Sequence, residues 1–459
     1  MTHQHATTIL ATLLLLCGAC GDDDGSGSGG PGSADASGGG TATSTATGTT
    51  ATSANPTNPT GPTDSTDPTD PTGADTTAGT EGPHSIVFVE VPIEQPLQRA
   101  TDLKFFPGTS EFLLLGKNGP VHHYALGEEG ATLLGSFSFP DVHTVTDCGV
   151  ISAAIDPDFA TNSFVYFGVC DSQTQSTIYR VQFGDDYDAI ADTRAPILTV
   201  GHPNASEPWH NVGAMGFDPQ GNLWAQFGDK TVSSSSQDTS NNLGTLVRIV
   251  PNRVPGESGY TPAADNPFVG DPAISDDIYA FGFRSPWRGL LDDQGRFWVG
   301  DVGSSNHEEV NLVTAPGQNF GWPVAEGTCQ AEDCRGLVDP IATWPHAAHP
   351  EIAEDADATA HQARVSWVGV QYVDRGNDRY GGLLTGKVLY GDSCIGYVRA
   401  LQADGDGRLV SNEHMGHLVA PTGWGQAPDG YIYVVNHGSC GSGEQEPPDV
   451  TLYRVELAP

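Results

Sequence analysis

The stretch that decides the fold is Trp209–Asp229, which reads WHNVGAMGFDPQGNLWAQFGD. Its second half contains an apolar run, a D-P-Q-G turn and a second apolar run. Turn residues between two alternating apolar runs are typical of a β-hairpin. His210 stands where this hairpin begins, and Asp229 stands where it ends. Because the two open ends of a hairpin lie side by side, we expect this imidazole and this carboxylate at one end of the unit.

The same apolar–turn–apolar pattern recurs along the chain. Six copies are found, of which the fifth is the least regular, at 103–115, 152–167, 214–227, 290–299, 365–392 and 426–434. No helical apolar periodicity of comparable length is present. A repeated β unit of this size cannot bury both of its faces alone, so neighbouring copies must stack. The sequence therefore predicts an all-β fold, a six-bladed β-propeller over residues 84–459.

The composition agrees with a turn-rich β protein and excludes some partners. The chain has 459 residues, 58 of them Gly and 33 Pro, and its formal net charge is −38. A surface of this sign repels phosphate backbones and anionic lipid headgroups. We therefore expect no nucleic-acid partner, and contact with a membrane only through a lipid anchor.

Residues 1–20 read as a lipoprotein signal peptide. Their apolar core, 9–16, is too short to span a bilayer. Small residues then precede Cys20, which resembles the lipobox of bacterial lipoproteins and makes Cys20 the predicted site of lipidation. An ordinary signal peptide cleaved nearby is the alternative. We expect an exported protein on the bacterial outer membrane or cell surface, with its domain in the periplasm or outside the cell.

Residues 21–83 consist almost entirely of Gly, Ser, Thr, Pro, Asp and Ala. Repeats such as PTNPTGPTDSTDPTDPTG cannot bury enough apolar surface to offset the entropy lost on ordering. The sequence predicts a disordered tether here, which holds the propeller away from a membrane.

Six cysteines follow the signal peptide, namely Cys148, Cys170, Cys329, Cys334, Cys394 and Cys440. An even number in an exported chain indicates disulfides, although the sequence does not give the pairing. Cys329 and Cys334 are a natural pair because they lie close together in one loop. By elimination, the other predicted pairs are Cys148–Cys170 and Cys394–Cys440. A zinc site is the alternative, but the spacings contain no C-x-x-C knuckle.

Several motifs occur together and in a fixed order: CGVISAAIDPDFATNSFVYF from Cys148, HNVGAMGFDPQGNLW from His210, GTLVRIVP from Gly244, ADNPF from Ala264, IYAFGFRSPWR from Ile278, DVGSSNHEEVNLV from Asp301, GQNFGWPVAEG from Gly317 and VLYGDSCIGYVRAL from Val388. In this order they resemble the soluble quinoprotein glucose/sorbosone dehydrogenases and their Hedgehog-interacting-protein-like relatives. The resemblance covers most of residues 85–457, and it implies the same six-bladed propeller.

The resemblance also implies an activity. The family oxidises an aldose or a related sugar alcohol group and passes hydride to pyrroloquinoline quinone (PQQ), which then reduces an external electron acceptor. By position, His210 is the general base and Asp229 fixes its tautomer. Arg284 is placed near the quinone oxygens, where a fixed cation stabilises developing charge.

Further cofactor contacts follow from the same resemblance. Ser285, Asp147 and Lys230 fall at positions that line the quinone site. The backbone carbonyls of Gly303 and Ser304 match the loop that holds a calcium ion against the quinone, and calcium accepts such neutral oxygen ligands.

The chain departs from the family pattern at several cofactor positions. Cys394 stands where the quinone enzymes have a lysine, and the segment 421–426 lacks the paired arginines of the last blade. Ser285 replaces an asparagine, and Asp147 or Cys148 replaces a glutamine or glutamate. PQQ carries three carboxylates, so the loss of several cations weakens its binding.

Two hypotheses follow from these departures. The first is an exported quinoprotein sugar dehydrogenase, and the second is a non-catalytic propeller that binds a glycan or a protein through the same face. At least two lysines or arginines besides Arg284 in the central funnel favour the enzyme, and Lys230 and Arg288 are candidates. The competing interpretation of His210 and Asp229 is an ordinary hydrogen-bonded histidine beside a turn.

Overall fold

The computed structural model describes residues 85–184, 190, 192–329, 334–346, 364–437 and 450–459. The predicted signal peptide, the predicted tether, Cys20 and Cys440 lie outside the described residues. Within the described part, no helix is long and apolar enough to cross a membrane.

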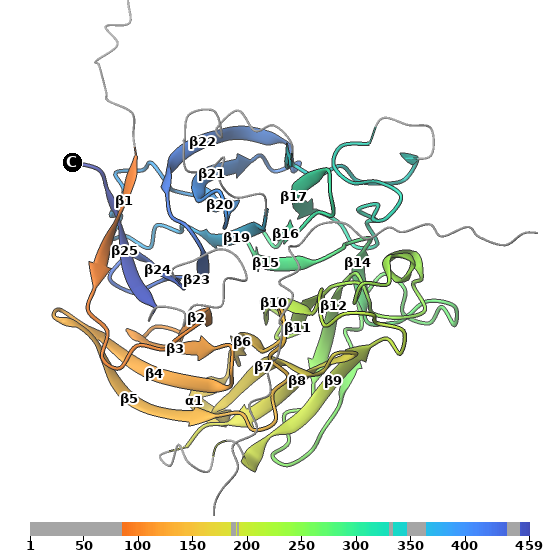
Figure 1. The fold of residues 1–459 in the computed structure, drawn as a ribbon, viewed down its shortest axis with the longest axis horizontal. Coiled ribbons are helices and arrows are strands. Elements are labelled where there is room, and N and C mark those ends of the chain that lie inside the picture. The colour runs from red at the N-terminus through yellow and green to blue at the C-terminus, as the bar shows by residue number, and fades with distance from the viewer. Residues whose placement is uncertain (1–84, 185–189, 191, 330–333, 347–363, 438–449) are drawn as a thin grey trace, which may run out of the picture. The chain divides into compact units, whose positions relative to one another are not determined.

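Six antiparallel sheets surround a central axis, which confirms the predicted six-bladed propeller (Figure 1). Blade 1 contains β2 (Ala100–Phe105), β3 (Glu111–Gly116), β4 (Pro120–Gly127) and β5 (Gly130–Ser138). Blade 2 contains β6 (Val150–Ile155), β7 (Phe164–Ser172), β8 (Gln175–Gln182) and β9 (Ala195–Gly201), with the short helix α1 (Phe159–Asn162) between its first two strands. Blade 3 contains β10 (Val212–Phe217), β11 (Leu223–Phe227), β12 (Thr245–Pro251), β13 (Tyr260–Pro262) and β14 (Ile278–Phe281).

The other three blades follow the same plan. Blade 4 contains β15 (Pro286–Leu291), β16 (Phe297–Asp301), β17 (His307–Val313) and β18 (Ala342–Pro345). Blade 5 contains β19 (Ser366–Gln371), β20 (Val388–Asp392), β21 (Tyr397–Ala403) and β22 (Leu409–His417). Blade 6 contains β23 (Pro421–Gln426), β24 (Ile432–Asn436), β25 (Thr451–Leu457) and β1 (Ile86–Val91). Each of the six repeats found in the sequence supplies the first two strands of one blade.

The ring of blades is closed by strands from the two ends of the domain. β1 pairs antiparallel with β25, from Ile86 opposite Leu457 to Val91 opposite Leu452. The outermost strand of blade 6 therefore comes from the start of the domain, and the last blade cannot separate from the first without breaking this ladder. Such closure removes the free edge that an open ring would expose.

The core lies between neighbouring blades. Trp367 of blade 5 stacks on Trp424 of blade 6 with ring centroids 4.9 Å apart. A larger apolar cluster joins blades 2 and 3 and includes Tyr166 and Phe227. Because both faces of each sheet are covered in this way, strands such as β7 and β11 are buried along nearly their whole length.

The inner strand of every blade shifts register near its start. These shifts, which mark a β-bulge, occur in β2, β6, β10, β15, β19 and β23. A bulge leaves one residue outside the ladder and bends the strand. The carbonyls of the residues skipped in this way in blades 1, 2, 4 and 6 meet one buried arginine on the axis, as described below.

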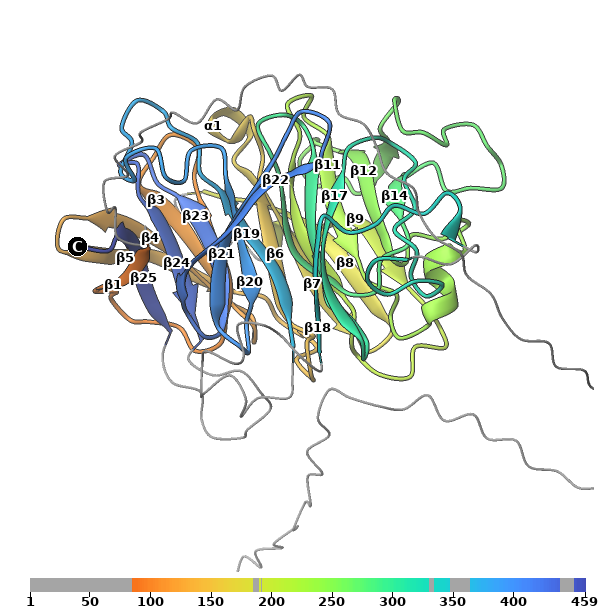
Figure 2. The ribbon, with the colours of Figure 1, turned by 90° about the horizontal axis from the view of Figure 1, so that it is seen from above.

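The topology decides which loops share an end of the propeller. In each blade the inner strand leaves one end and the second strand returns to it, so the segments before the inner strand and after the second strand lie together there. We call this end the site end, because His210 precedes β10 and Asp229 follows β11. Seen from the side, α1 lies at the opposite end (Figure 2).

Candidate functional site

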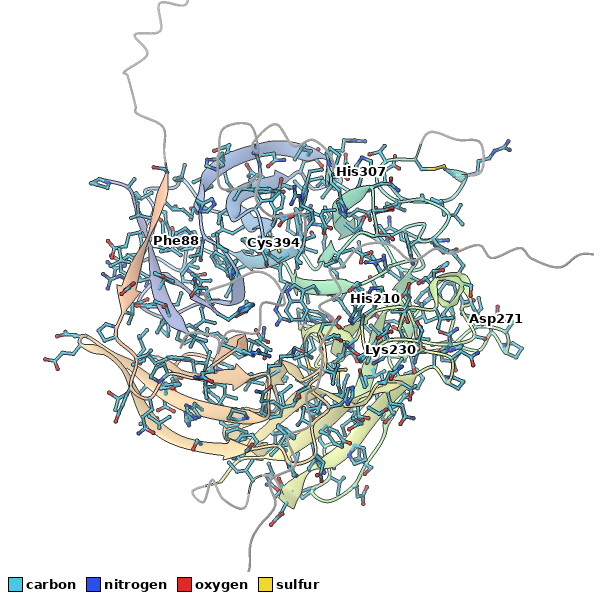
Figure 3. The ribbon with its side chains drawn as sticks, in the orientation of Figure 1. Phe88, His210, Lys230, Asp271, His307 and Cys394 are labelled. Atoms are coloured by element: carbon cyan, nitrogen blue, oxygen red, sulfur yellow. A yellow bond between two sulfur atoms is a disulfide. The ribbon has the colours of Figure 1, made fainter. Side chains whose placement is uncertain are left out.

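His210 and Asp229 form a buried dyad at the site end. His210 Nδ1 lies 2.5 Å from Asp229 Oδ1, and the two side chains are 9% and 1% exposed. In Figure 3 His210 lies beside Lys230, the residue after Asp229. The hairpin therefore brings together the two side chains that it was predicted to bring together.

The backbone holds His210 in an uncommon conformation. Its φ is 55°, in the left-handed region, which costs a non-glycine residue on the order of 1 kcal/mol. The His210 N–H donates to Asp147 Oδ2 at 2.9 Å. Gly228 is required nearby, because a Cβ there would lie 2.6 Å from the His210 carbonyl oxygen. Asp147, predicted as a cofactor contact, thus also fixes the base through this hydrogen bond.

The Asp229 carboxylate accepts from two residues besides His210, and its backbone N–H donates to a third. The Trp322 indole N–H donates to Oδ2 at 2.8 Å, and the Thr231 N–H donates to Oδ1 at 2.8 Å. The Asp229 N–H donates to the Arg284 carbonyl at 2.8 Å, which ties blade 3 to blade 4. Burial alone raises the pKa of Asp229, but His210, Trp322 and Arg284 together hold that pKa below its usual value. Asp229 is therefore a carboxylate at neutral pH.

A carboxylate facing Nδ1 determines what the other ring nitrogen can do. Nδ1 carries the ring proton and donates a hydrogen bond to Asp229. The lone pair of the ring is then on Nε2. Nε2 makes no hydrogen bond to any part of the chain that the structure describes. The dyad therefore presents an oriented, unoccupied proton acceptor.

Replacing Asp229 with asparagine is expected to lower kcat for any reaction in which His210 is the general base about 10²- to 10⁴-fold, with a much smaller change in KM. The amide keeps the size of the side chain, but its NH₂ can donate to Nδ1 and thereby move the ring proton to Nε2. Steady-state kinetics of Asp229→Asn across a pH series measures this. An unchanged kcat would show that Asp229 does not set the tautomer of His210.

Arg284 lies beside the dyad with its guanidinium on backbone carbonyls. Its Nη1 donates to the carbonyls of Val302 at 3.0 Å and Gly303 at 2.6 Å. The guanidinium lies 5.5 Å from the centre of the Trp322 ring, which also binds Asp229. Arg284 and the dyad thus meet at one indole, as predicted for two parts of one site.

Asp301 positions the backbone of Arg284. It accepts the N–H of Arg284 at 2.9 Å and that of Ser285 at 2.7 Å. Burial, together with the charge of Glu309, raises the pKa of Asp301 well above its usual value. Ser285, predicted to contact the cofactor, is placed at the site end through this backbone bond.

The loop after β16 was predicted to bind calcium through the carbonyls of Gly303 and Ser304. Glu326 Oε1 accepts the N–H groups of the loop, those of Ser304, Ser305, Asn306 and His307, at 2.7–3.1 Å. These bonds fix the loop without a metal. The Gly303 carbonyl is already bound by Arg284, so a guanidinium occupies the place where the prediction put a cation.

Lys230 is 1% exposed and lies beneath the dyad instead of lining an open funnel. Its ammonium donates to Asn211 Oδ1. Asn211 in turn donates to the Pro208 carbonyl at 2.8 Å. Lys230 therefore braces the segment that enters β10 and carries His210.

The cysteine predictions have different outcomes. Cys329 and Cys334 are disulfide-bonded, as predicted. Cys394 is disulfide-bonded too, but its predicted partner, Cys440, lies outside the described residues. The structure has Cys148 and Cys170 as free, buried thiols, so the predicted bond between them is not formed in it. Their side chains are hydrogen-bonded to each other, so elimination paired two neighbouring cysteines.

Cys148 also has a polar neighbour besides Cys170. Its Sγ lies 3.4 Å from Asn211 Oδ1, the same oxygen that Lys230 binds. The thiol therefore belongs to the buried network under the dyad.

Arg288, the other predicted funnel cation, does not face a ligand. It is 5% exposed and lies on the axis, where Nε donates to the Thr422 carbonyl at 2.8 Å and Nη2 to the Ile151 carbonyl at 3.0 Å. It also donates to the carbonyls of Thr101 and Trp287. All four carbonyls belong to the bulged residues of inner strands, so Arg288 joins blades 1, 2, 4 and 6.

Two cations at the site end were missed from the sequence. Arg99 directly precedes β2, and Lys117 directly follows β3. In blade 1 the Lys117 N–H donates to the Arg99 carbonyl, as the Gly228 N–H donates to the Asn211 carbonyl in blade 3, so the two cations hold the places next to those of His210 and Asp229. The repeats contained this signal, because each copy places the residue before its first strand and the residue after its second strand at the same end of the propeller.

Comparison with known proteins agrees with this geometry. Residues 97–442 match the family model described as glucose/sorbosone dehydrogenase. The chain belongs to this family. It is 24% identical over 370 residues to the aldose sugar dehydrogenase YliI of Escherichia coli. The aligned region covers 77% of this chain and 91% of the relative. It is 33% identical over 146 residues to the HIPL1 protein of Arabidopsis thaliana, or 28% of this chain and 20% of the plant protein.

A solved structure shares the propeller of this family member. The PQQ-bound form of the aldose sugar dehydrogenase of Streptomyces coelicolor superposes with a TM-score of 0.62 at 21% identity, covering 82% of this chain and 98% of the other. At this identity the likeness shows the fold. The chemistry of this chain must be argued from its own residues.

Proposed function

We propose that this family member is an exported dehydrogenase that oxidises an aldose or a related sugar alcohol group by hydride transfer to PQQ, with an external acceptor taking the electrons. The observation that carries the proposal is the His210–Asp229 dyad, whose 2.5 Å contact leaves Nε2 as the proton acceptor. A solvated turn histidine would not need a buried carboxylate held by an indole and a backbone amide.

The chain's own residues supply proton transfer and charge stabilisation. A sugar hydroxyl placed at Nε2 gives up its proton to His210, and Asp229 stabilises the imidazolium that forms. Arg284 supplies a fixed positive charge beside the dyad, where it stabilises negative charge developing on a nearby oxygen. PQQ supplies, when bound, the electrophilic quinone that takes the hydride.

The donor set at the site end fits an anionic cofactor. Arg284 binds only backbone carbonyl oxygens among the described residues, so no carboxylate contact neutralises its charge there. Arg99 and Lys117 add two more cations at this end. The chain thus has cations besides Arg284, although they differ from those predicted.

The loop after β16 is less suited to calcium than the cations of the site end are to PQQ. The Gly303 carbonyl already accepts from the Arg284 guanidinium, whose charge repels a calcium ion at that oxygen, so no step above is routed through calcium. We expect PQQ affinity to change less than about twofold when calcium is removed with EGTA, because the guanidinium already provides the positive charge. Absorbance titration of PQQ with and without calcium measures this. A large loss of affinity on chelation would show that the metal displaces Arg284.

The N-terminal segments complete the proposal. We propose that Cys20 carries the lipid and that residues 21–83 tether the propeller to the outer membrane or cell surface. Labelling with an alkyne-bearing fatty acid tests this, since label retained in Cys20→Ala would place the lipid elsewhere.

The activity is tested by titrating the purified chain with PQQ and then supplying a panel of aldoses and a redox dye. The proposal requires stoichiometric PQQ binding and dye reduction by at least one aldose. Absence of PQQ binding at saturating cofactor and calcium would favour the non-catalytic propeller that binds a glycan or a protein.

A further inference from the structure

Arg99 and Lys117 form a pair of neighbouring cations at the site end. The Lys117 N–H donates to the Arg99 carbonyl at 3.0 Å, so the two residues share one backbone contact. Both are half-buried. Arg99 has a φ of 51°, in the left-handed region, which is the conformation that His210 has in blade 3. The fold therefore holds Arg99 in an uncommon backbone geometry, as it holds the base.

Neither cation forms an ion pair with a carboxylate of the part of the chain that the structure describes. The Lys117 ammonium donates to the Thr146 carbonyl. The Arg99 guanidinium makes no hydrogen bond or ion pair with any described residue. The chain has 57 acidic residues and only 19 lysines and arginines. In other blades cations such as Arg248 and Arg296 bind aspartates directly.

The two positive charges of the pair repel each other. Burial lowers the pKa of Lys117, and the charge of Arg99 lowers that pKa further. Burial likewise lowers the pKa of His437, and both cations add to this effect. The nearby carboxylate that favours the charged lysine is Asp147, and it accepts the N–H of His210. Two like charges that face each other in this way are stabilised by an anion between them.

The pair is connected directly to the dyad. Thr146, which accepts from Lys117, is followed by Asp147, which accepts from His210. The Thr146 hydroxyl also donates to the Pro208 carbonyl at 3.1 Å, next to the segment that carries the base. A ligand group bound by Arg99 and Lys117 therefore lies next to Thr146 and Asp147, the short segment that positions the imidazole.

We propose that Arg99 and Lys117 form a carboxylate-binding subsite for the ligand that occupies the site end. This inference rests on the proposed function and specifies its ligand chemistry. A guanidinium binds a carboxylate through two parallel hydrogen bonds, and the adjacent ammonium adds a second charge. Two ligands bring such a group to this end: PQQ, through one of its carboxylates, and an acidic sugar such as a uronate.

The test uses the full chain, three variants of the cation pair and one control variant. Arg99→Gln and Lys117→Gln remove one charge each, and Lys117→Arg keeps the charge. Arg375→Gln is the matched control, because Arg375 is exposed and lies in the β19–β20 connection at the opposite end. Thermal unfolding confirms that each variant folds. The binding probes are PQQ and its trimethyl ester, which keeps the ring system but has no carboxylate charge.

If the subsite binds the cofactor, each Gln variant loses PQQ affinity about 10- to 100-fold. Lys117→Arg and Arg375→Gln keep the PQQ affinity of the unmodified chain, and the ester binds all variants alike. If the subsite binds the sugar, PQQ affinity is unchanged, and kcat/KM for glucuronate falls in the Gln variants relative to that for glucose.

Equal PQQ affinity together with an unchanged glucuronate-to-glucose ratio in both Gln variants would overturn the subsite. A chain that binds no PQQ at all would overturn the proposed function instead. In that case calorimetric titration with glucuronate decides the subsite, since binding must weaken in both Gln variants, and equal or absent binding rejects it.

Discussion

Replacing His210 with alanine is expected to lower kcat for aldose oxidation about 10³- to 10⁴-fold, while PQQ binding and the midpoint of thermal unfolding stay near those of the unmodified chain. Among the described residues at the site end, this imidazole combines a buried carboxylate on Nδ1 with an unbound Nε2. Its removal takes away the proton acceptor and leaves the cations in place.

His202→Ala serves as the matched control. His202 precedes β10 in the same connection as His210, and its ring accepts the N–H of Asn204 at 3.1 Å without contacting the dyad. We expect this variant to keep the turnover of the unmodified chain. Turnover within about tenfold of the unmodified rate in His210→Ala would remove the proposed base, because general base catalysis contributes at least 10²-fold.

Replacing Arg288 with methionine is expected to lower the free energy of unfolding by about 3 kcal/mol or more. The guanidinium is 5% exposed and binds the carbonyls of bulged residues in four blades. Methionine fills much of the volume but leaves buried carbonyls such as those of Ile151 and Thr422 without donors. Burial lowers the pKa of Arg288, the direction expected when a charge is removed from water.

Urea unfolding of Arg288→Met measures this loss, with Arg375→Met as the surface control. A substitution at an exposed site of this kind changes stability by about 0.5 kcal/mol or less. If Arg288→Met were also within about 0.5 kcal/mol of the unmodified chain, the account of Arg288 as the residue that joins the blades at the axis would be wrong.

The fold was predictable because its signal is local and repeated. Each copy of the apolar–turn–apolar pattern, such as 214–227, encodes one hairpin, and stacking of the copies follows from their apolar faces. The closure by β1 and β25 joins residues from opposite ends of the domain. No local pattern contains that pairing, so it came only with the structure.

The same distinction between local and long-range signals explains which residues of the site could be predicted. His210 and Asp229 were found together because one hairpin carries both. Trp322, which binds Asp229, is distant in sequence and comes from the long connection between β17 and β18. Arg288 was expected in the funnel because its sequence neighbours match a family motif. The β-bulge at Trp287 instead directs the Arg288 side chain toward the propeller axis.

The most direct test of the central claim is a single-turnover experiment on the PQQ-loaded chain under anaerobic conditions. Glucose and glucose deuterated at C1 are mixed with the enzyme in turn, and the quinone absorbance is followed in the unmodified chain and in His210→Ala. The account predicts that the sugar bleaches the quinone, that deuterium slows the bleaching severalfold, and that His210→Ala binds PQQ but does not bleach. Bound PQQ that no aldose in a broad panel reduces would contradict it.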